Sequence, residues 1–341
     1  MRLFAALCLG CGLAGPAAVA AETKGPVIPS IMAEGHLRCG VIRNSAGIAD
    51  TDDAGKWHGF FPDLCRAAAA ALVGRADGVD FVELSAETRF DAVRDGVVHV
   101  LMANSTLTLG RDADGLEFPT VALYDGQGFM APASKGWTKL AEVDNARVCV
   151  IRGTTTIGNL TDLIAEAKPG LKTLEMASHD GLFEAFFSRR CDLVTTDRVI
   201  LAAHRSFRAA SPADFVIFPD VISKEPLAPV VSEDSDDLAE AFRWIIWALL
   251  EAEELKVTGA TARALKSRPP TKAVSRLLDS SGELKPPAGL EPGWALRAIE
   301  AVGNYGEVFA RNLGNQSPIG LERGQNALWK DGGLMYAPPF R

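Results

Sequence analysis

An arginine follows three small polar side chains in a loop where the sequence predicts a ligand. Residues 97–102 form an apolar run that is expected to be a buried strand. The loop after this run carries Asn104, Thr106, Thr108 and Arg111. An open α/β sheet places its ligand groups at such strand ends, and a guanidinium can hold a carboxylate through two parallel hydrogen bonds. This stretch therefore favours a small anion, and a solvated surface arginine is the ordinary alternative.

A second stretch offers backbone donors for the same kind of anion. Gly153, Thr154, Thr155 and Thr156 directly follow the apolar run 147–151, and a helix is expected to start among them. The first N–H groups of a helix lack intrahelical acceptors, and the helix dipole favours negative charge at that end. Plain N-capping of the helix by a threonine hydroxyl is the alternative interpretation.

An acidic residue, Asp197, ends another predicted strand, residues 191–197. A carboxylate at the end of a strand is a suitable partner for a ligand ammonium group. The alternative is that Asp197 caps the helix expected at 198–205. Both roles are compatible, because a carboxylate has several acceptor positions.

These stretches must be positioned by a sheet, and the first third of the chain predicts one. Strands are expected at 36–41, 79–84 and 97–102, with helices between them at 62–72 and 89–95. This alternation predicts an α/β arrangement in which parallel strands are joined by right-handed crossovers.

The middle of the chain repeats the alternation and predicts a second sheet. Its strands are expected at 147–151, 173–176, 191–197 and 215–218. Residues 118–130 break the rhythm with Gly126 and Gly128, and we expect them to connect two lobes. Residues 221–231 are expected to cross back. Two lobes also suit the length of 341 residues, which is long for one hydrophobic core.

The sequence therefore predicts a discontinuous first lobe and a continuous second one. Residues 21–129 and 225–341 are assigned to lobe 1, with a C-terminal extension, and residues 130–224 to lobe 2. Helices are expected in lobe 1 at 238–255 and 298–312. The first of these is very apolar, but Glu240 and Arg243 interrupt it, so we expect a buried helix and not a membrane span.

The first twenty residues have the features of a signal peptide. Arg2 precedes an apolar stretch at 3–19, and Ala18-Val19-Ala20 is a small-residue cleavage pattern. We therefore expect export and release of residues 21–341. The net charge of −8 argues against nucleic acid or an anionic membrane as a partner.

Four cysteines would remain after removal of the signal peptide: Cys39, Cys65, Cys149 and Cys191. An even number in an exported chain predicts disulfides, and three connectivities are possible. We favour Cys39–Cys65 and Cys149–Cys191, because each bridge then lies within one lobe. The five histidines are scattered without metal-ligand spacing, so neither a metal nor a cofactor is expected.

Taken together, the motifs resemble solute-binding protein family 3, the periplasmic receptors of amino-acid ABC importers, and within it the general amino-acid subgroup. The residues that carry the resemblance lie at 59–60, 63–66, 84–86, 89–90, 108–112, 124–130, 153–156, 195–197, 222–227, 301–307 and 336–339. The combination spans nearly the whole chain and is specific, although each motif alone is weak.

The resemblance implies a periplasmic-binding-protein-like fold, with a ligand cleft between two α/β lobes. It assigns the ligand α-carboxylate to Arg111 and to the helix start at Thr154, with Thr155 and Thr156 adjacent. Asp197 corresponds to the acid that binds the ammonium group. Further donors of the first lobe fall at Asn104 and Thr106. The implied partners are a small amino-acid-like ligand and an inner-membrane ABC permease, and the implied state is a periplasmic monomer.

The chain departs from its family at positions beside these motifs. Met102, Ala103 and Leu107 stand where a serine, an arginine and a tryptophan are usual, and Ile48 replaces an aromatic residue. These changes favour an altered binding wall and therefore a different range of ligand side chains.

Two other functions are compatible with the same fold. A dehydratase-like enzyme needs an acid whose pKa is raised by an apolar pocket. Asp197 would pair with the ligand ammonium, and Glu225 is expected to form a salt bridge at the second crossing, so we expect no enzyme. A receptor that presents its closed lobes to a sensor is the second alternative.

Overall fold

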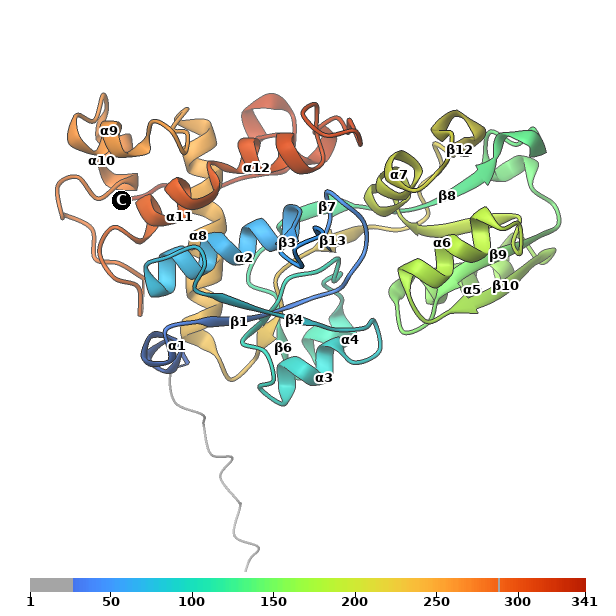
Figure 1. Cartoon of the computed structure of the whole chain (residues 1–341), viewed down its shortest axis with the longest axis horizontal. Coiled ribbons are helices and arrows are strands. Elements are labelled where there is room, and N and C mark those ends of the chain that lie inside the picture. The colour runs from blue at the N-terminus through green and yellow to red at the C-terminus, as the bar shows by residue number, and fades with distance from the viewer. Residues whose placement is uncertain (1–26, 288) are drawn as a thin grey trace, which may run out of the picture.

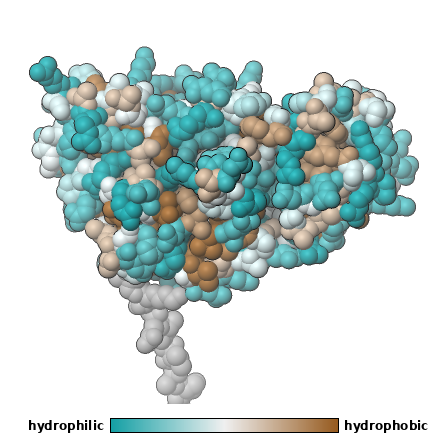
Figure 2. All heavy atoms as spheres, in the orientation of Figure 1, coloured by the Kyte–Doolittle hydropathy of each residue, from teal (hydrophilic) through white to brown (hydrophobic). Residues whose placement is uncertain are grey.

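The computed structural model describes residues 27–287 and 289–341. The predicted signal peptide at 1–20 lies outside this part of the chain. Two sheets with their helices form two lobes, which stand side by side in Figure 1. Figure 2 shows the same division on the surface, where a larger and a smaller rounded mass meet and hydrophilic side chains cover most of the face.

The first lobe is built on a parallel sheet of order β4-β1-β5. Strand β1 (Leu37–Val41) pairs in parallel with β4 (Val79–Glu83) and β5 (Val100–Leu101). Helices α2 (Phe60–Val73) and α3 (Arg89–Arg94) connect these strands, which confirms the predicted β-α-β-α-β order. The strand expected at 97–102 is shorter than predicted, because the chain at Val98 bonds back to the end of α3 through the carbonyl of Ala92.

The second lobe contains a five-stranded sheet of order β10-β9-β11-β8-β12. The bounds of these strands are β8 (Gln127–Pro132), β9 (Ala146–Ile151), β10 (Leu171–Met176), β11 (Leu193–Asp197) and β12 (Phe215–Ile217). Strands β9, β10 and β11 are parallel, whereas β8 is antiparallel to both β11 and β12. Helices α5 (Thr155–Glu166), α6 (His179–Phe187) and α7 (Arg198–Phe207) pack on this sheet.

Two short strands carry the chain between the lobes, and we call them the crossing strands. Strand β7 (Leu123–Asp125) pairs antiparallel with β13 (Glu225–Leu227), and Asp125 faces Glu225 in the register. The predicted second crossing therefore contains β13, which begins at residue 225. The boundary expected at 129/130 falls inside β8, which belongs to the second sheet from its first residue, Gln127.

The C-terminal part of the chain returns to the first lobe and packs on it as helices (Figure 1). The long helix α8 (Asp236–Glu254) and α11 (Trp294–Val302) both pack against α2. The helix predicted at 298–312 is two helices, because the chain breaks at Gly303, where φ is 83°. Asn304 then starts α12 (Tyr305–Asn312) with a capping box, in which its side chain accepts from the N–H of Glu307 and the Glu307 carboxylate accepts from its N–H.

The remaining elements are short and complete the lobes. They are α1 (Ile28–Glu34), β2 (Asp50–Thr51), β3 (Trp57–His58), α4 (Leu109–Asp112), β6 (Leu116–Glu117), η1 (Ala133–Lys135), η2 (Leu140–Glu142), η3 (Pro212–Asp214), β14 (Val231–Ser232), α9 (Ala262–Ser267), α10 (Lys272–Leu277), η4 (Gly324–Asn326) and η5 (Trp329–Asp331). Among the helices of residues 27–341, none combines the length and the apolar character needed to cross a membrane.

One disulfide joins a strand to a neighbouring segment in each lobe. Cys39 of β1 is bonded to Cys65 of α2. Cys149 of β9 is bonded to Cys191, which lies just before β11. These are the two pairs that the sequence analysis favoured.

Candidate functional site

A small cavity lies between the lobes, at the carboxyl ends of the strands that the sequence analysis singled out. The space between its lining atoms is about 360 Å³, part of which is open to solvent. Seven of the residues predicted from the sequence line it: Asn104, Thr106, Arg111, Thr154, Thr155, Thr156 and Asp197. Six residues that were not assigned to the site also line it: Ile42, Ala86, Arg89, Ile151, His179 and Thr196. The predicted residues therefore converge, although they come from both lobes.

Arg111 is held in place by its own loop. The side chain of Thr108 caps the short helix α4 by accepting from the N–H of Arg111 at 3.3 Å. The Arg111 guanidinium donates to the carbonyl of Thr106 at 2.7 Å, and its Cζ lies 4.7 Å from the centre of the Phe90 ring. Among the described residues, no acid lies within ion-pair distance of this guanidinium. Burial lowers the pKa of Arg111, whereas the charges of Glu225 and Asp197 favour its charged form.

Helix α5 begins at the opposite wall of the cavity. Thr154 occupies its N-cap position, but its hydroxyl donates to the carbonyl of Ile151 at 2.7 Å and makes no cap bond. The alternative of plain N-capping by this threonine is therefore wrong. The first turn, with Thr155 and Thr156, keeps its N–H groups for other acceptors, and the helix dipole favours an anion there.

Asp197 faces the first lobe from the end of β11. Its side chain is buried and accepts a hydrogen bond from Asn104 Nδ2 at 2.7 Å, across the cleft. Burial raises the pKa of Asp197 well above its ordinary value, and the charges of Asp125 and Glu225 raise it further. Within the described chain, no basic side chain pairs with this carboxylate. A ligand cation would meet an acid that is buried and without a counter-charge.

Asp197 is free for such a role because another residue caps the helix that follows it. It occupies the N-cap position of α7, yet its side chain makes no cap bond. The carboxylate of Asp125, on β7, accepts from the N–H of Val199 at 2.9 Å instead. Burial raises the pKa of Asp125 to about 6, although the N–H groups of Val199 and Gly126 favour its charged form. The alternative in which Asp197 caps α7 is therefore wrong.

Glu225 is the main polar residue near the site that the sequence analysis misjudged. It is buried on β13 and accepts from Ser223 at 2.6 Å, Thr155 at 3.1 Å and Asn159 at 3.2 Å, as well as from the hydroxyl of Thr106. The expected salt bridge is absent from the described residues, because hydroxyl and amide donors surround the carboxylate instead of a base. Glu225 thus ties both lobes to a crossing strand.

Arg89 and His179 are two further residues at the cavity that were not predicted as site residues. Arg89 is 3% exposed at the start of α3. His179 is buried at the start of α6, and burial, with the nearby charge of Arg89, lowers its pKa to about 4, so the ring is neutral at neutral pH. The pair Arg89-Phe90 was part of the family resemblance, which was the one signal available for it.

Two residues that were predicted to bind the ligand lie outside the cavity wall. The four positions at which the chain differs from its family also lie outside it. Thr108 caps α4, and Gly153, at φ 73°, starts the turn before α5. Met102, Ala103 and Ile48 are buried in the core, and Leu107 is 37% exposed. The expectation that these four residues form an altered wall is therefore wrong: the apolar wall is Ile42, Ala86 and Ile151.

The two lobes touch across the cleft in several places. Arg152 pairs with Glu87 at 2.6 Å, and His204 hydrogen-bonds Asn44 at 2.9 Å. The bond between Asn104 and Asp197 is a third contact. The structure therefore has the cleft closed over a small cavity.

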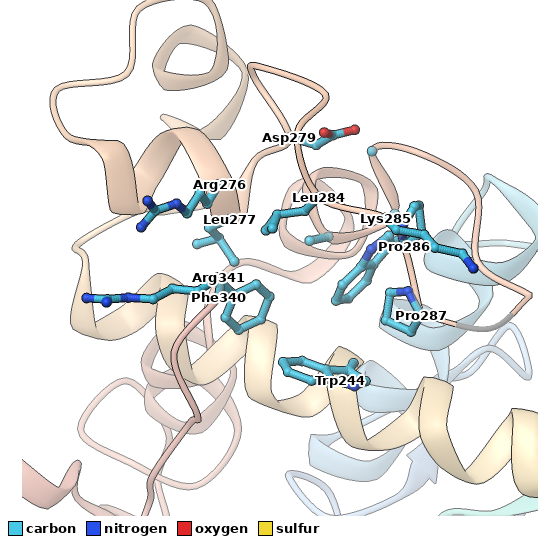
Figure 3. Close-up of a pocket in the computed structure, with 13 residues that line it drawn as sticks. Trp244, Arg276, Leu277, Asp279, Leu284, Lys285, Pro286, Pro287, Phe340 and Arg341 are labelled. Carbon is cyan, nitrogen blue, oxygen red and sulfur yellow. The ribbon is translucent and has the colours of Figure 1, made fainter.

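A second hollow lies far from this cleft, in the C-terminal extension of the first lobe. Figure 3 shows Trp244, Leu284, Pro287 and Phe340 around this groove of about 600 Å³, which Arg276, Lys285 and Arg341 also border. Phe340 and Trp244 pack in a T-shaped arrangement, with their ring centres 5.3 Å apart. The groove is formed by one lobe alone, so movement between the lobes does not act on it. Among the described residues, no cluster of three or more His, Cys, Asp or Glu could hold a metal ion.

Comparison with known proteins gives relatives that span nearly the whole chain. No protein-family model matches. The glutamate/glutamine/aspartate/asparagine-binding protein BztA of Rhodobacter capsulatus is 41% identical over 326 residues, or 95% of this chain and 96% of that protein. The general L-amino acid-binding periplasmic protein AapJ of Rhizobium johnstonii is 37% identical over 340 residues, or 97% of each. A glutathione-bound ABC transporter/periplasmic binding protein from Brucella ovis has a TM-score of 0.90 at 38% identity, covering 93% of this chain and 100% of that one.

Proposed function

This chain belongs to solute-binding protein family 3, the amino-acid-binding proteins of ABC transporters, and on that premise we propose that it captures an L-amino acid between its lobes for import. The receptor would then hand the ligand to an inner-membrane ABC permease. In this proposal the site consists of Arg111, Asn104, Thr106, the start of α5 and Asp197.

The observation that carries the proposal is the charge pattern of the cavity. Arg111 and the first turn of α5 offer donors for a carboxylate, and Asp197 offers an acceptor for an ammonium group. Neither Arg111 nor Asp197 has an ionic partner among the described residues. A free α-amino acid supplies both missing charges at once, whereas a simple anion or cation supplies only one.

Closure follows from where the groups are attached. Arg111 belongs to the first lobe, and α5 and Asp197 belong to the second. A ligand that binds all three favours the closed arrangement over an open one. The crossing strands β7 and β13 are the segments about which this motion would occur. We place the lobe boundaries near residues 126–127 and 224–225.

The remaining expectations belong to the same proposal. Residues 1–20 would direct export to the periplasm, where the two disulfides would form, and the receptor would act as a monomer. A catalytic role is not proposed, because Asp197 would be occupied by the ligand ammonium and the curated relatives are binding proteins.

The range of ligands is wider than the cavity alone would admit. A second space of about 650 Å³ adjoins the cavity, and the two share Ile42, Ala86, Ile151 and His179. A ligand with an amino-acid head and a longer body fits this arrangement, so glutathione, which the Brucella ovis protein holds, joins the common amino acids as a candidate.

The test is a thermal-shift screen on protein that has been unfolded, dialysed and refolded. Common L-amino acids, several D-amino acids and glutathione are compared on the wild type and on Arg111→Ala. At about 100 times its Kd a ligand stabilises the folded state by about 2.7 kcal/mol, and we expect this shift to vanish in Arg111→Ala. Arg94→Ala is the control, because Arg94 pairs on the surface with Asp91 and Asp114. A shift that survives in Arg111→Ala, or no shift with any compound, would contradict the proposal.

A further inference from the structure

Glu225 is a buried carboxylate beside the cavity, and the proposed recognition of an amino acid gives it no role. It is 2% exposed on β13 and is not among the residues that line the cavity. Its Oε1 accepts from the hydroxyl of Ser223 at 2.6 Å and from Nδ2 of Asn159 at 3.2 Å. Its Oε2 accepts from the hydroxyl of Thr155 at 3.1 Å and from that of Thr106. Four protein donors therefore satisfy this carboxylate without a ligand.

These donors belong to both lobes. Glu225 is attached to the first lobe, because β13 pairs with β7 and Leu227 forms a bridge with Thr106. Thr155 and Asn159 belong to helix α5, which packs on β9, β10 and β11 of the second lobe. A motion that opens the cleft would therefore separate α5 from Glu225.

Two of the four donors also line the ligand cavity. Thr106 and Thr155 face it from opposite lobes, and the same oxygen of Glu225 accepts from both. A hydroxyl group has one hydrogen to donate and two lone pairs to accept with. Because each hydrogen is directed at Glu225, the two threonines are left with lone pairs for a ligand. Glu225 thus orients a side chain in each wall of a cavity that it does not itself line.

The charge of Glu225 also acts on the two charged groups that would hold an amino acid. Burial lowers the pKa of Arg111, and the charge of Glu225 opposes this shift. Burial raises the pKa of Asp197, and Glu225 raises it further. Asp125, which faces Glu225 on the other crossing strand, accepts from backbone N–H groups instead. Glu225 is therefore the acid of this pair that is bonded to side chains of the cavity.

We propose that Glu225 is a positioning residue of the binding site, which joins Thr106 of the first lobe to helix α5 of the second and so slows the release of a bound ligand. This inference rests on the proposed function, since the ligand must bind between the lobes. Because every group in these bonds belongs to the protein, the bonds also favour closure before a ligand has bound.

The first experiment is stopped-flow and calorimetric binding of L-glutamine and L-glutamate to refolded wild type and Glu225→Gln. The variant keeps the size of the side chain but replaces one acceptor oxygen by an NH2 group, so it cannot accept from all four donors. We expect its dissociation rate constant to rise about tenfold, as for a lost hydrogen bond to a charged group, at a nearly unchanged association rate constant. Glu300→Gln, which changes a carboxylate paired with Arg263 in the C-terminal extension, should alter neither rate constant.

A second variant tests whether Glu225 acts through α5. Thr155→Val removes one donor at nearly constant shape and should also raise the dissociation rate constant. Combined with Glu225→Gln, it should raise this constant by less than the product of the two single effects, because both changes remove the same bond. Thr161→Val, at an exposed position of the same helix, is the control. Thr155→Val is the deciding variant if Glu225→Gln does not fold.

Small-angle X-ray scattering of the ligand-free protein tests closure without a ligand. We expect a larger radius of gyration for Glu225→Gln than for the wild type, and equal values once both are saturated with ligand. An unchanged dissociation rate constant in Glu225→Gln would overturn the inference, as would fully independent effects of Glu225→Gln and Thr155→Val. If the wild type binds no amino acid, the proposed function is wrong, and the scattering comparison alone decides whether Glu225 holds the lobes together.

Discussion

Asn104 Nδ2 donates a hydrogen bond to Asp197 Oδ2 at 2.7 Å, and this bond joins the two lobes at the centre of the cleft. The bond favours the charged form of Asp197, whereas burial favours its neutral form and raises its pKa. A ligand ammonium group would act in the same direction as Asn104 and favour the carboxylate. The predictions below follow from this arrangement and from the contacts around it.

Amino-acid binding should weaken as the pH falls. Because burial raises the pKa of Asp197, proton uptake by this carboxylate competes with the ligand ammonium group as the pH falls. Below that pKa we expect Kd to rise by about tenfold per pH unit, with one proton released on binding. Calorimetry from pH 5 to 8.5, in two buffers with different ionisation enthalpies, measures both effects. Asp197→Asn should bind weakly and show little pH dependence, and a flat Kd in the wild type would show that Asp197 does not pair with the ligand.

The folded state should become less stable as the pH rises, because of Asp125. In the folded protein the pKa of Asp125 is about 6, above the ordinary value of 3.8. The stability that its protonated form contributes is therefore fully present below pH 3.8 and is lost as the pH rises through 6. The loss amounts to about 3 kcal/mol at 1.36 kcal/mol per pKa unit. Asp125→Asn keeps an oxygen for the N–H of Val199 and removes the titration.

Urea unfolding at pH 4 and pH 7 checks this prediction. From pH 4 to pH 7, the unfolding free energy of Asp125→Asn should increase relative to that of the wild type. Asp77→Asn, which changes an exposed carboxylate, should show no such gain. If the unfolding free energies of the wild type and Asp125→Asn change equally between the two pH values, the pKa of Asp125 is not raised in the folded protein.

The C-terminal extension should stabilise a crossing strand through Asn326. Its side chain accepts from the N–H of Tyr124 at 2.7 Å and donates to the carbonyl of Tyr124 at 2.8 Å. Asn326→Ala leaves both backbone groups of β7 without these partners and should cost about 1–3 kcal/mol of unfolding free energy. Hydrogen exchange at Tyr124 should also accelerate. Asn315→Ala, at an exposed asparagine, is the control, and equal exchange in the two variants would argue against this role.

Loss of the disulfide in the second lobe should destabilise the protein without abolishing recognition. Cys149 and Cys191 are 42 residues apart, and neither lines the cavity. Closing a loop of this size is worth about 4 kcal/mol in the chain-entropy model. We expect Cys149→Ala with Cys191→Ala to lose about this much in denaturant unfolding at unchanged ligand Kd. A loss under about 1 kcal/mol would mean that the unfolded chain is already compact there.

The sequence by itself determined those features of the structure that depend on residues close together in the chain. Apolar runs predicted the strands of the first sheet and four of the five strands of the second, whereas β8 was expected to be a connection between the lobes. Arg111, Thr154 and Asp197 were recognised because each follows or ends a predicted strand. The separation into lobes was also enough to favour the two disulfide pairs. Where two local signals competed the prediction was wrong, as at Gly303, where a left-handed residue and a capping box end a helix that apolar spacing alone would continue.

Only the tertiary structure decided which polar groups are buried together and what partners they have. Asp125 is 72 residues before Asp197, yet it takes the cap of α7 and leaves Asp197 free. Glu225 was expected to pair with a base, but donors from both lobes surround it. Arg89 donates to the carbonyls of Ala86 and Gly153 and has no ionic partner among the described residues. Burial, hydrogen-bond competition and charge balance depend on distances between remote segments, and local sequence patterns do not encode those distances.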